Sequence, residues 1–215
     1  MKDTLHGIKV EQKLKAHKNL LGEHKRVNSA NFKGYAGLTH TAKEICEFIP
    51  KCKIFVEPFA GLGRISKHVL SEKYILNDLS DYAIRYLTKH FTHHEITQED
   101  YLKCIMSNNS KDAFIFQDPP WFDNIYEDNP LTAYTKPNKE IYNELEILLP
   151  TLKADWMIAG RTEGILSKWD KVNFYHKEIK SKKNYLFGHK ARTYLVSNKP
   201  FTNYHQQSLF SFGEE

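Results

Sequence analysis

The sequence predicts an α/β fold with a Rossmann-like sheet that is mostly parallel and closes with a late antiparallel hairpin. Short apolar runs alternate with helix-like segments through most of the chain, as a parallel sheet requires. A glycine turn follows the first apolar run, which is typical of the start of such a sheet. The chain has 215 residues, of which 40% are hydrophobic and 27% charged, so it can form one good core.

The expected elements follow from the apolar runs and from the breaker residues between them. The first helix spans residues 39–48, begins near Thr39 or Thr41 and ends before Pro50. The other helices are expected near residues 64–71, 80–90 and 141–149. The parallel strands are expected near residues 54–57, 73–77, 94–97, 113–117 and 155–159. The closing antiparallel pair is expected at residues 172–179 and 192–197, and a loop at residues 122–138.

The most informative motif is Asp118-Pro119-Pro120-Trp121, which follows the apolar run 113–116. These residue types suit the methylation of an exocyclic amine, whose lone pair is delocalised into its ring. The Asp118 carboxylate and a backbone carbonyl of the proline turn would accept the amine's hydrogen bonds and stabilise its developing positive charge. The prolines fix φ and so aim the carbonyls, while Trp121 would stack on a base taken out of its duplex. A plain turn is the alternative interpretation.

A second motif, Glu57-Pro58-Phe59-Ala60-Gly61-Leu62-Gly63, follows the apolar run 54–56. Glycines at this place let the backbone approach a ligand, and the N-terminus of a following helix favours negative charge. The turn lacks the third glycine of the dinucleotide fingerprint, so a nicotinamide cofactor is not favoured. A purely structural turn is the alternative.

Two further acids follow predicted strands. Asp78 comes after the strand near 73–77, roughly twenty residues beyond the glycine turn, where a ribose diol is commonly held. Asp100 follows the next strand and precedes Asp118. Each acid taken alone is equally well interpreted as a helix N-cap. The chain order of glycine turn, two acids and Asp118 favours a binding site.

The two central motifs, residues 55–63 and 118–121, resemble those of the S-adenosylmethionine-dependent DNA adenine-N6 methyltransferases of the Dam-like (D12) class. Residues 32–37 resemble that family's N-terminal cofactor motif, and residues 184–196 its late hairpin. The resemblance covers roughly residues 32–198. It implies a Rossmann-like methyltransferase sheet, S-adenosyl-L-methionine as the cofactor and DNA as the partner.

The resemblance also implies roles for single residues. Asp78 would hold the cofactor's ribose, Asp100 its adenine amine, and residues 35–37 would lie by its methionine end. The implied cofactor-binding residues are Tyr35, Ala36, Gly37, Glu57, Pro58, Phe59, Gly61, Gly63, Asp78, Asp100 and Asp118. The implied catalytic residues are Asp118, Pro119, Pro120 and Trp121, and these roles need no metal.

This chain departs from the family's pattern in two places. Leu38 and Thr39 stand where the family usually has a glycine and a lysine. Only seventeen residues separate Asp100 from Asp118, where the family often carries a target-recognition domain, so a connecting helix or loop is expected. Relaxed specificity and a partner subunit that supplies sequence recognition are the two resulting alternatives.

The positive charge of the chain is concentrated at its N-terminus. Residues 1–33 contain eight Lys or Arg and three Asp or Glu, which accounts for the whole formal net charge of +5. A basic arm beside a neutral domain suits contact with a phosphate backbone, and a solvated tail is the alternative. The candidate nucleic-acid-binding residues, including a second cluster at the late hairpin, are Lys15, Lys18, Lys25, Arg26, Lys182, Lys183, Lys190 and Arg192.

We divide the chain into a basic arm (1–31), a methyltransferase domain (32–200) and a C-terminal tail (201–215). Cys46, Cys52 and Cys104 lack metal-site spacing, so they are interpreted as buried or half-buried thiols in a reducing compartment. No apolar run has the length of a signal segment or a membrane span. We therefore expect a soluble, cytoplasmic protein that does not contact a membrane.

The sequence thus predicts an enzyme that methylates the N6 amine of adenine in DNA. Adenine-N6 methylation of RNA and cytosine-N4 methylation of DNA are alternatives, because these amines pose the same chemical problem. A catalytically silent, cofactor-binding subunit that presents DNA to a partner is an alternative from another class. The recognition sequence, the oligomeric state and any accompanying restriction nuclease are left open.

Overall fold

The computed structural model of this chain describes residues 38, 41–120, 138–160, 169, 173–180 and 192–204. All of these residues belong to one compact unit within residues 37–215. The side chains of residues 138, 180 and 192 are not among the described parts.

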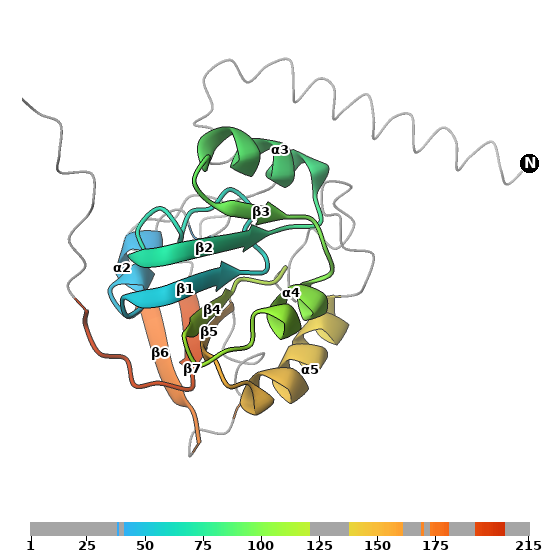
Figure 1. The fold of residues 1–215 in the computed structure, drawn as a ribbon. Coiled ribbons are helices and arrows are strands. Elements are labelled where there is room, and N and C mark those ends of the chain that lie inside the picture. Colours follow the sequence, from blue (N-terminus) through green and yellow to red (C-terminus); the bar gives the residue numbers. More distant parts are fainter. Residues whose placement is uncertain are drawn as a thin grey trace, which may run out of the picture. The chain divides into compact units, whose positions relative to one another are not determined.

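A seven-stranded mixed sheet is the centre of the described unit (Figure 1). Its strand order is β3-β2-β1-β4-β5-β7-β6. The strands are β1 (Cys52–Glu57), β2 (Ser71–Asn77), β3 (Glu95–Thr97), β4 (Ala113–Gln117), β5 (Asp155–Gly160), β6 (Tyr175–Lys180) and β7 (Arg192–Ser197). The first five strands are parallel, whereas β7 runs antiparallel to both β5 and β6. The prediction of a mostly parallel sheet with a late antiparallel pair is confirmed.

Helices cover both faces of this sheet. On one face, α4 (Tyr101–Ser107) and α5 (Asn138–Leu148) pack on side chains such as Val56 and Ile115. On the other face, α2 (Ala42–Cys46) packs on Phe55 and its neighbours together with Ile65 and Val69, and α3 (Asp81–His90) packs on Leu76. Because both faces are covered, β4 is buried along its whole length and reads as one apolar run ending in a glutamine.

The predicted helices near 39–48, 80–90 and 141–149 are present, and the connection after Asp100 is the helix α4. The first of them, α2, is shorter than predicted and begins after Thr41. Leu38 is 3% exposed and packs in the same cluster as α2, so this residue has a structural role where the family usually has glycine.

The prediction of a helix near residues 64–71 is wrong. Residues 61–68 form successive turns instead, and β2 already begins at Ser71. Gly61 and Gly63, directly before residues 64–71, have positive φ, at 53° and 62°, so no α-helix extends back through the glycine turn. The buried Ile65 and Val69 have helical spacing, but this segment buries them through turns such as the bond from the His68 N–H to the Ile65 carbonyl (2.9 Å).

Gly63 is fixed by packing as well as by its backbone conformation. A Cβ at this position would lie 2.5 Å from Cζ of Phe91, and the residue's φ of +62° already disfavours any side chain. We expect Gly63→Ala to lower the free energy of unfolding by about 2 kcal/mol or more, because strain and overpacking add. Urea denaturation measures this loss. Adding Phe91→Leu to Gly63→Ala is expected to restore part of this stability. If the double variant instead loses as much stability as the two single variants together, Phe91 does not limit the space at Gly63.

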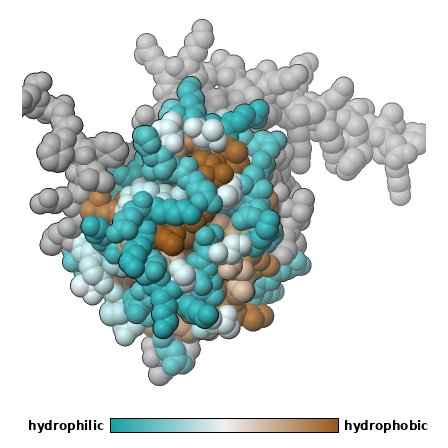
Figure 2. Space-filling model, viewed as in Figure 1, coloured by the Kyte–Doolittle hydropathy of each residue, from teal (hydrophilic) through white to brown (hydrophobic). Residues whose placement is uncertain are grey.

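Hydrophilic residues cover most of the face seen in Figure 2, with smaller hydrophobic areas between them. Among the described residues, no helix has the length and apolar character that a membrane span requires. Cys46 and Cys104 are buried and Cys52 is half-buried, all as free thiols, as the sequence predicts. Beyond β7, Phe201 makes an edge contact with Phe48, and the Tyr204 N–H donates to the Glu47 carbonyl (2.6 Å).

Candidate active site

The carboxyl ends of β1 and β4 meet where the strand order of the sheet reverses. The two strands are parallel neighbours, with Val56 opposite Ile115. Glu57 ends β1 and Asp118 follows β4, so both carboxyls lie at this edge. Ligands of open α/β sheets bind at such switch points. Asp118 and Asp78 both act electrostatically on Glu57, so the structure brings three predicted site acids together.

Glu57 is 2% exposed and is the most perturbed acid of this edge. Burial raises the pKa of its carboxyl to about 8; Ser66 beside it opposes the shift, and the negative charges of Asp118 and Asp78 add to it. Its Oε2 is buried and has no hydrogen-bond partner among the described residues. A buried carboxyl with an unsatisfied oxygen is suited to a cationic or hydrogen-bond-donating ligand.

Asp78 holds the glycine turn in place. Its Oδ2 accepts a hydrogen bond from the Gly61 N–H and its Oδ1 one from the Ser80 N–H, both at 2.9 Å. Burial raises the pKa of the Asp78 carboxyl to about 6, while these backbone donors favour its charged form. Because Gly61 has positive φ, its N–H is directed to a carboxylate that follows the neighbouring strand β2.

The other predicted cofactor residues in the described part have clear structural partners. Phe59 is buried against Tyr101 with 4.9 Å between the ring centroids, and the Pro58 carbonyl accepts a hydrogen bond from Asn77 Nδ2 (3.0 Å). Asp100 is exposed and is the N-cap of α4, since its Oδ1 accepts from the Leu102 N–H at 2.9 Å. The N-cap interpretation of Asp100 is therefore confirmed, and a second role toward the cofactor stays a prediction.

In the catalytic motif, Pro119 is buried, whereas Asp118 and Pro120 are half-buried. The remaining predicted site residues lie outside the described residues, apart from the backbone of Arg192 in β7. They are Tyr35, Ala36, Gly37, Trp121, Lys15, Lys18, Lys25, Arg26, Lys182, Lys183 and Lys190.

Two residues that the sequence analysis did not single out belong to this edge. Arg64 directly follows the glycine turn and is half-buried; burial lowers the pKa of its guanidinium, while Tyr86 and Asp118 raise it. Gln117 is the last residue of β4 and is fully buried. The sequence did contain a signal for each of them. Arg64 is a charged residue directly after a glycine turn, and Gln117 is a polar residue at the end of an apolar strand.

The amide of Gln117 has no hydrogen-bond partner for its Nε2 or its Oε1 among the described residues. Asn77, at the corresponding end of β2, is fully satisfied: it donates to Pro58 and Glu99 and accepts from Thr97 and Glu99, at 2.9–3.0 Å.

We expect Gln117→Met to raise the free energy of unfolding by about 1–3 kcal/mol, because it removes an unsatisfied buried amide. The matched Asn77→Leu should instead lower it. A Gln117→Met protein that unfolds at lower denaturant concentration than wild type would show that the amide is satisfied in the fold.

A family model of D12 class N6 adenine-specific DNA methyltransferases matches residues 39–204 of the chain. The chain belongs to this family. It is therefore a methyltransferase that uses S-adenosylmethionine, and the predicted family and cofactor are confirmed. The match begins at Thr39 and ends at Tyr204, so it includes the glycine turn, the acids and the Asp118 motif.

The fold agrees with this membership. Magnesium protoporphyrin IX methyltransferase from Synechocystis PCC 6803 with bound S-adenosylmethionine has a TM-score of 0.51 at 10% identity, covering 81% of this chain and 86% of that one. The Streptococcus mutans protein SMU.1697c in complex with S-adenosylhomocysteine has a TM-score of 0.50 at 9% identity, covering 73% and 94%. At these identities the likeness concerns the Rossmann-like fold alone. No curated protein matches the chain by sequence.

The residues at this edge fit S-adenosylmethionine. The cofactor carries two cationic groups, a sulfonium and an ammonium. The edge holds the buried carboxyls of Glu57 and Asp78, and burial raises the pKa of both. The unsatisfied Oε2 of Glu57 is available for a donor. A positive ligand relieves the unfavourable proximity of these acids.

Proposed function

We propose that this methyltransferase transfers the methyl group of S-adenosylmethionine to the N6 amine of adenine in DNA. The observation that carries the proposal is the placement of Asp118 directly after β4, next to the glycine turn that follows β1. DNA is favoured over RNA because the matching family model describes DNA methyltransferases. Adenine is favoured over cytosine on the same ground.

In the proposed site, the chain binds its cofactor at the carboxyl ends of β1 and β2 and the target base beside β4. Glu57 faces the cationic groups of the cofactor, and Asp78, already bonded to Gly61, holds the ribose. Asp100 has one carboxylate oxygen engaged by α4, and its other oxygen takes the cofactor's adenine amine. The remaining proposed cofactor contacts are Tyr35, Ala36, Gly37, Pro58, Phe59 and Gly63.

The cofactor, when bound, supplies a methyl group activated by a positively charged sulfur. Asp118 and the Pro119 carbonyl accept the two N–H groups of the target amine, draw its lone pair out of conjugation and stabilise the positive charge that forms on nitrogen. Trp121 stacks on the flipped base. Arg64 interacts electrostatically with Asp118 and so adds a positive charge to the site.

The test is methyl transfer from radiolabelled S-adenosylmethionine by the purified full-length chain, with mixed-sequence duplex DNA and structured RNA as separate substrates. Mass spectrometry of the hydrolysed product identifies the methylated nucleoside. N6-methyladenine in DNA, absent with the Asp118→Ala variant, supports the proposal. Label in RNA alone identifies an RNA methyltransferase, and N4-methylcytosine a cytosine enzyme. Cofactor binding without transfer to either substrate indicates a silent subunit.

The basic arm is proposed to contact the phosphate backbone through Lys15, Lys18, Lys25 and Arg26, with Lys182, Lys183, Lys190 and Arg192 as a second contact. Deleting residues 1–31 should weaken binding to all DNA sequences about equally. The slope of log affinity against log salt should shrink by about 0.9 for each lost phosphate contact. Fluorescence anisotropy across a salt series measures both quantities.

The matched control for the deletion replaces the four arm residues Lys15, Lys18, Lys25 and Arg26 by glutamine and keeps the chain length. The same reduction in slope is expected. An unchanged slope in both variants would identify a solvated tail, and a loss confined to one DNA sequence would identify base contacts.

A further inference from the structure

Arg64 is a positive side chain placed among the acids of the candidate active site. It directly follows Gly63, whose N–H donates to the Ala60 carbonyl at 2.7 Å, so the turn sets the position of its backbone. It is half-buried and interacts electrostatically with Asp118. Asp118 in turn acts on Glu57, which is fully enclosed. Arg64 therefore belongs to the same cluster of groups at the ends of β1 and β4.

The cofactor brings a carboxylate into this cluster as part of its methionine moiety. The acids Glu57, Asp78 and Asp118 already lie at this edge, and a further carboxylate is unfavourable there without a cation beside it. The guanidinium of Arg64 is such a cation, and its planar fork of five N–H donors matches the two oxygens of a carboxylate. A guanidinium has five N–H donors, so one partner does not exhaust them.

We infer that Arg64 binds the carboxylate of the cofactor's methionine moiety and thereby positions the cofactor beside Asp118. The inference rests on the proposed placement of the cofactor at the ends of β1 and β2. It adds a contact at the methionine end that the sequence motifs do not include. It also gives Arg64 a part in positioning, since the same side chain interacts electrostatically with Asp118, the group proposed to accept the target amine.

The experiment compares two ligands that differ in this carboxylate alone, S-adenosylmethionine and its decarboxylated form. Calorimetry on the full-length protein measures both affinities without nucleic acid. Wild type should bind S-adenosylmethionine more tightly. Arg64→Gln should lose about ten- to a hundredfold in affinity for S-adenosylmethionine, the range for a hydrogen-bonded charged group, and little for the decarboxylated ligand. Arg64→Lys should keep part of the preference, because it keeps the charge and loses the fork.

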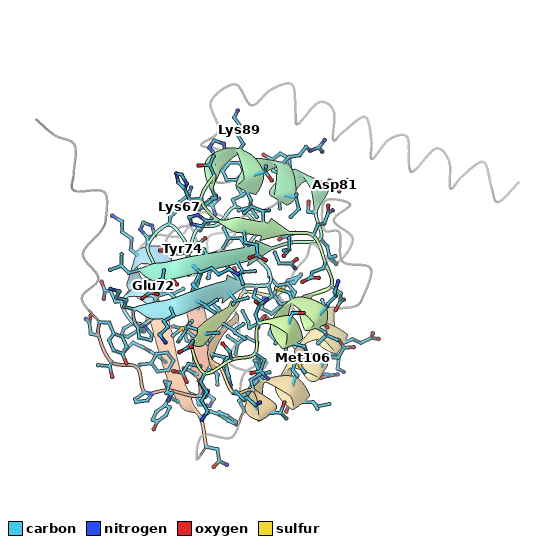
Figure 3. The ribbon with its side chains drawn as sticks, in the orientation of Figure 1. Lys67, Glu72, Tyr74, Asp81, Lys89 and Met106 are labelled. Atoms are coloured by element: carbon cyan, nitrogen blue, oxygen red, sulfur yellow. The ribbon has the colours of Figure 1, made fainter. Side chains whose placement is uncertain are left out.

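Lys67→Gln is the matched control. Lys67 is exposed, belongs to the same turn segment, and lies 5.8 Å and 5.7 Å from the ring centroids of Tyr86 and Phe91. Figure 3 shows it towards the end of the sheet away from Asp81, which begins α3 beyond the carboxyl end of β2. This variant should keep the wild-type ratio of the two affinities.

Equal losses of affinity for both ligands in Arg64→Gln would overturn the inference, because the carboxylate would then have no special role. Unchanged cofactor affinity together with weaker DNA binding and a smaller salt slope would also overturn it and would place Arg64 on a phosphate instead. Since no nucleic acid is present in the ligand comparison, an error in the proposed DNA substrate leaves its result unaffected. The two proposals therefore fail separately.

Discussion

Asp118→Ala is expected to lower the turnover of methyl transfer by about 10²-fold or more, the scale for removing one preorganised polar group from a reacting centre. The reason is that the target amine is a weak nucleophile until an acceptor engages its N–H groups. Affinity for S-adenosylmethionine should stay within a few-fold of wild type, because Glu57, Asp78 and the glycine turn remain. Single-turnover assays and calorimetry measure the two effects separately.

Asp112→Ala is the matched control for this variant. Asp112 precedes β4 at its other end, is exposed, and forms an ion pair with Lys53 at 3.0 Å. Exposed pairs contribute little to stability, so this variant should methylate at the wild-type rate. If Asp118→Ala also methylates at nearly the wild-type rate, Asp118 is not the acceptor and the mechanism is wrong.

A Trp121→Ala variant should act differently. It should weaken the binding of the flipped base by about 1–3 kcal/mol, because it removes the face on which the base stacks.

The central strands of this protein were predictable because a strand that is buried on both faces is a continuous apolar run in the sequence. β4 coincides with the predicted strand at 113–117, since an apolar run is bounded by polar residues at both ends. β7 likewise coincides with residues 192–197. The glycine turn was placed correctly as well, whereas the segment after it was not. Its apolar spacing fits both a helix and the observed turns, so the spacing alone does not distinguish them.

The unsatisfied Gln117 was not predictable, for a physical reason. Whether a buried amide is bonded depends on segments far away in the chain, as Asn77 illustrates with partners at Pro58, Thr97 and Glu99. The raised pKa of Glu57 has the same origin, because its burial and its acidic neighbours come from three separate segments. Sequence motifs identify which residues meet at the sheet edge, and packing determines their charge states.

The charge state of Glu57 leads to the second large effect, a dependence of cofactor affinity on pH. The pKa of its carboxyl is raised to about 8 in the cofactor-free structure, so Glu57 is mainly protonated at neutral pH. The sulfonium and ammonium groups of a bound cofactor favour the carboxylate and lower this pKa. Binding below about pH 8 therefore releases a proton from Glu57, and this linkage raises the affinity as the pH rises toward that value.

We expect affinity for S-adenosylmethionine to increase between about pH 6.5 and 7.5 by up to about tenfold, the limit for one linked proton per pH unit. This window lies above the pKa of Asp78, which is about 6, so Asp78 contributes little to the slope. Calorimetry in buffers of different ionisation enthalpy measures the released proton directly.

Glu57→Gln tests the assignment of that proton. The amide resembles the neutral acid that the fold already holds at neutral pH, so this variant is expected to fold. Its affinity for the cofactor should be lower than that of wild type at pH 7.5 and nearly constant across the window. A wild-type affinity that does not change with pH would show that the carboxyl is already charged before the cofactor binds. A Glu57→Gln variant that keeps the full slope would assign the linked proton to another group. The buried, unpaired Oε2 of Glu57 favours the expected rise of affinity with pH, because a buried carboxylate with an unsatisfied oxygen is costlier than a neutral acid.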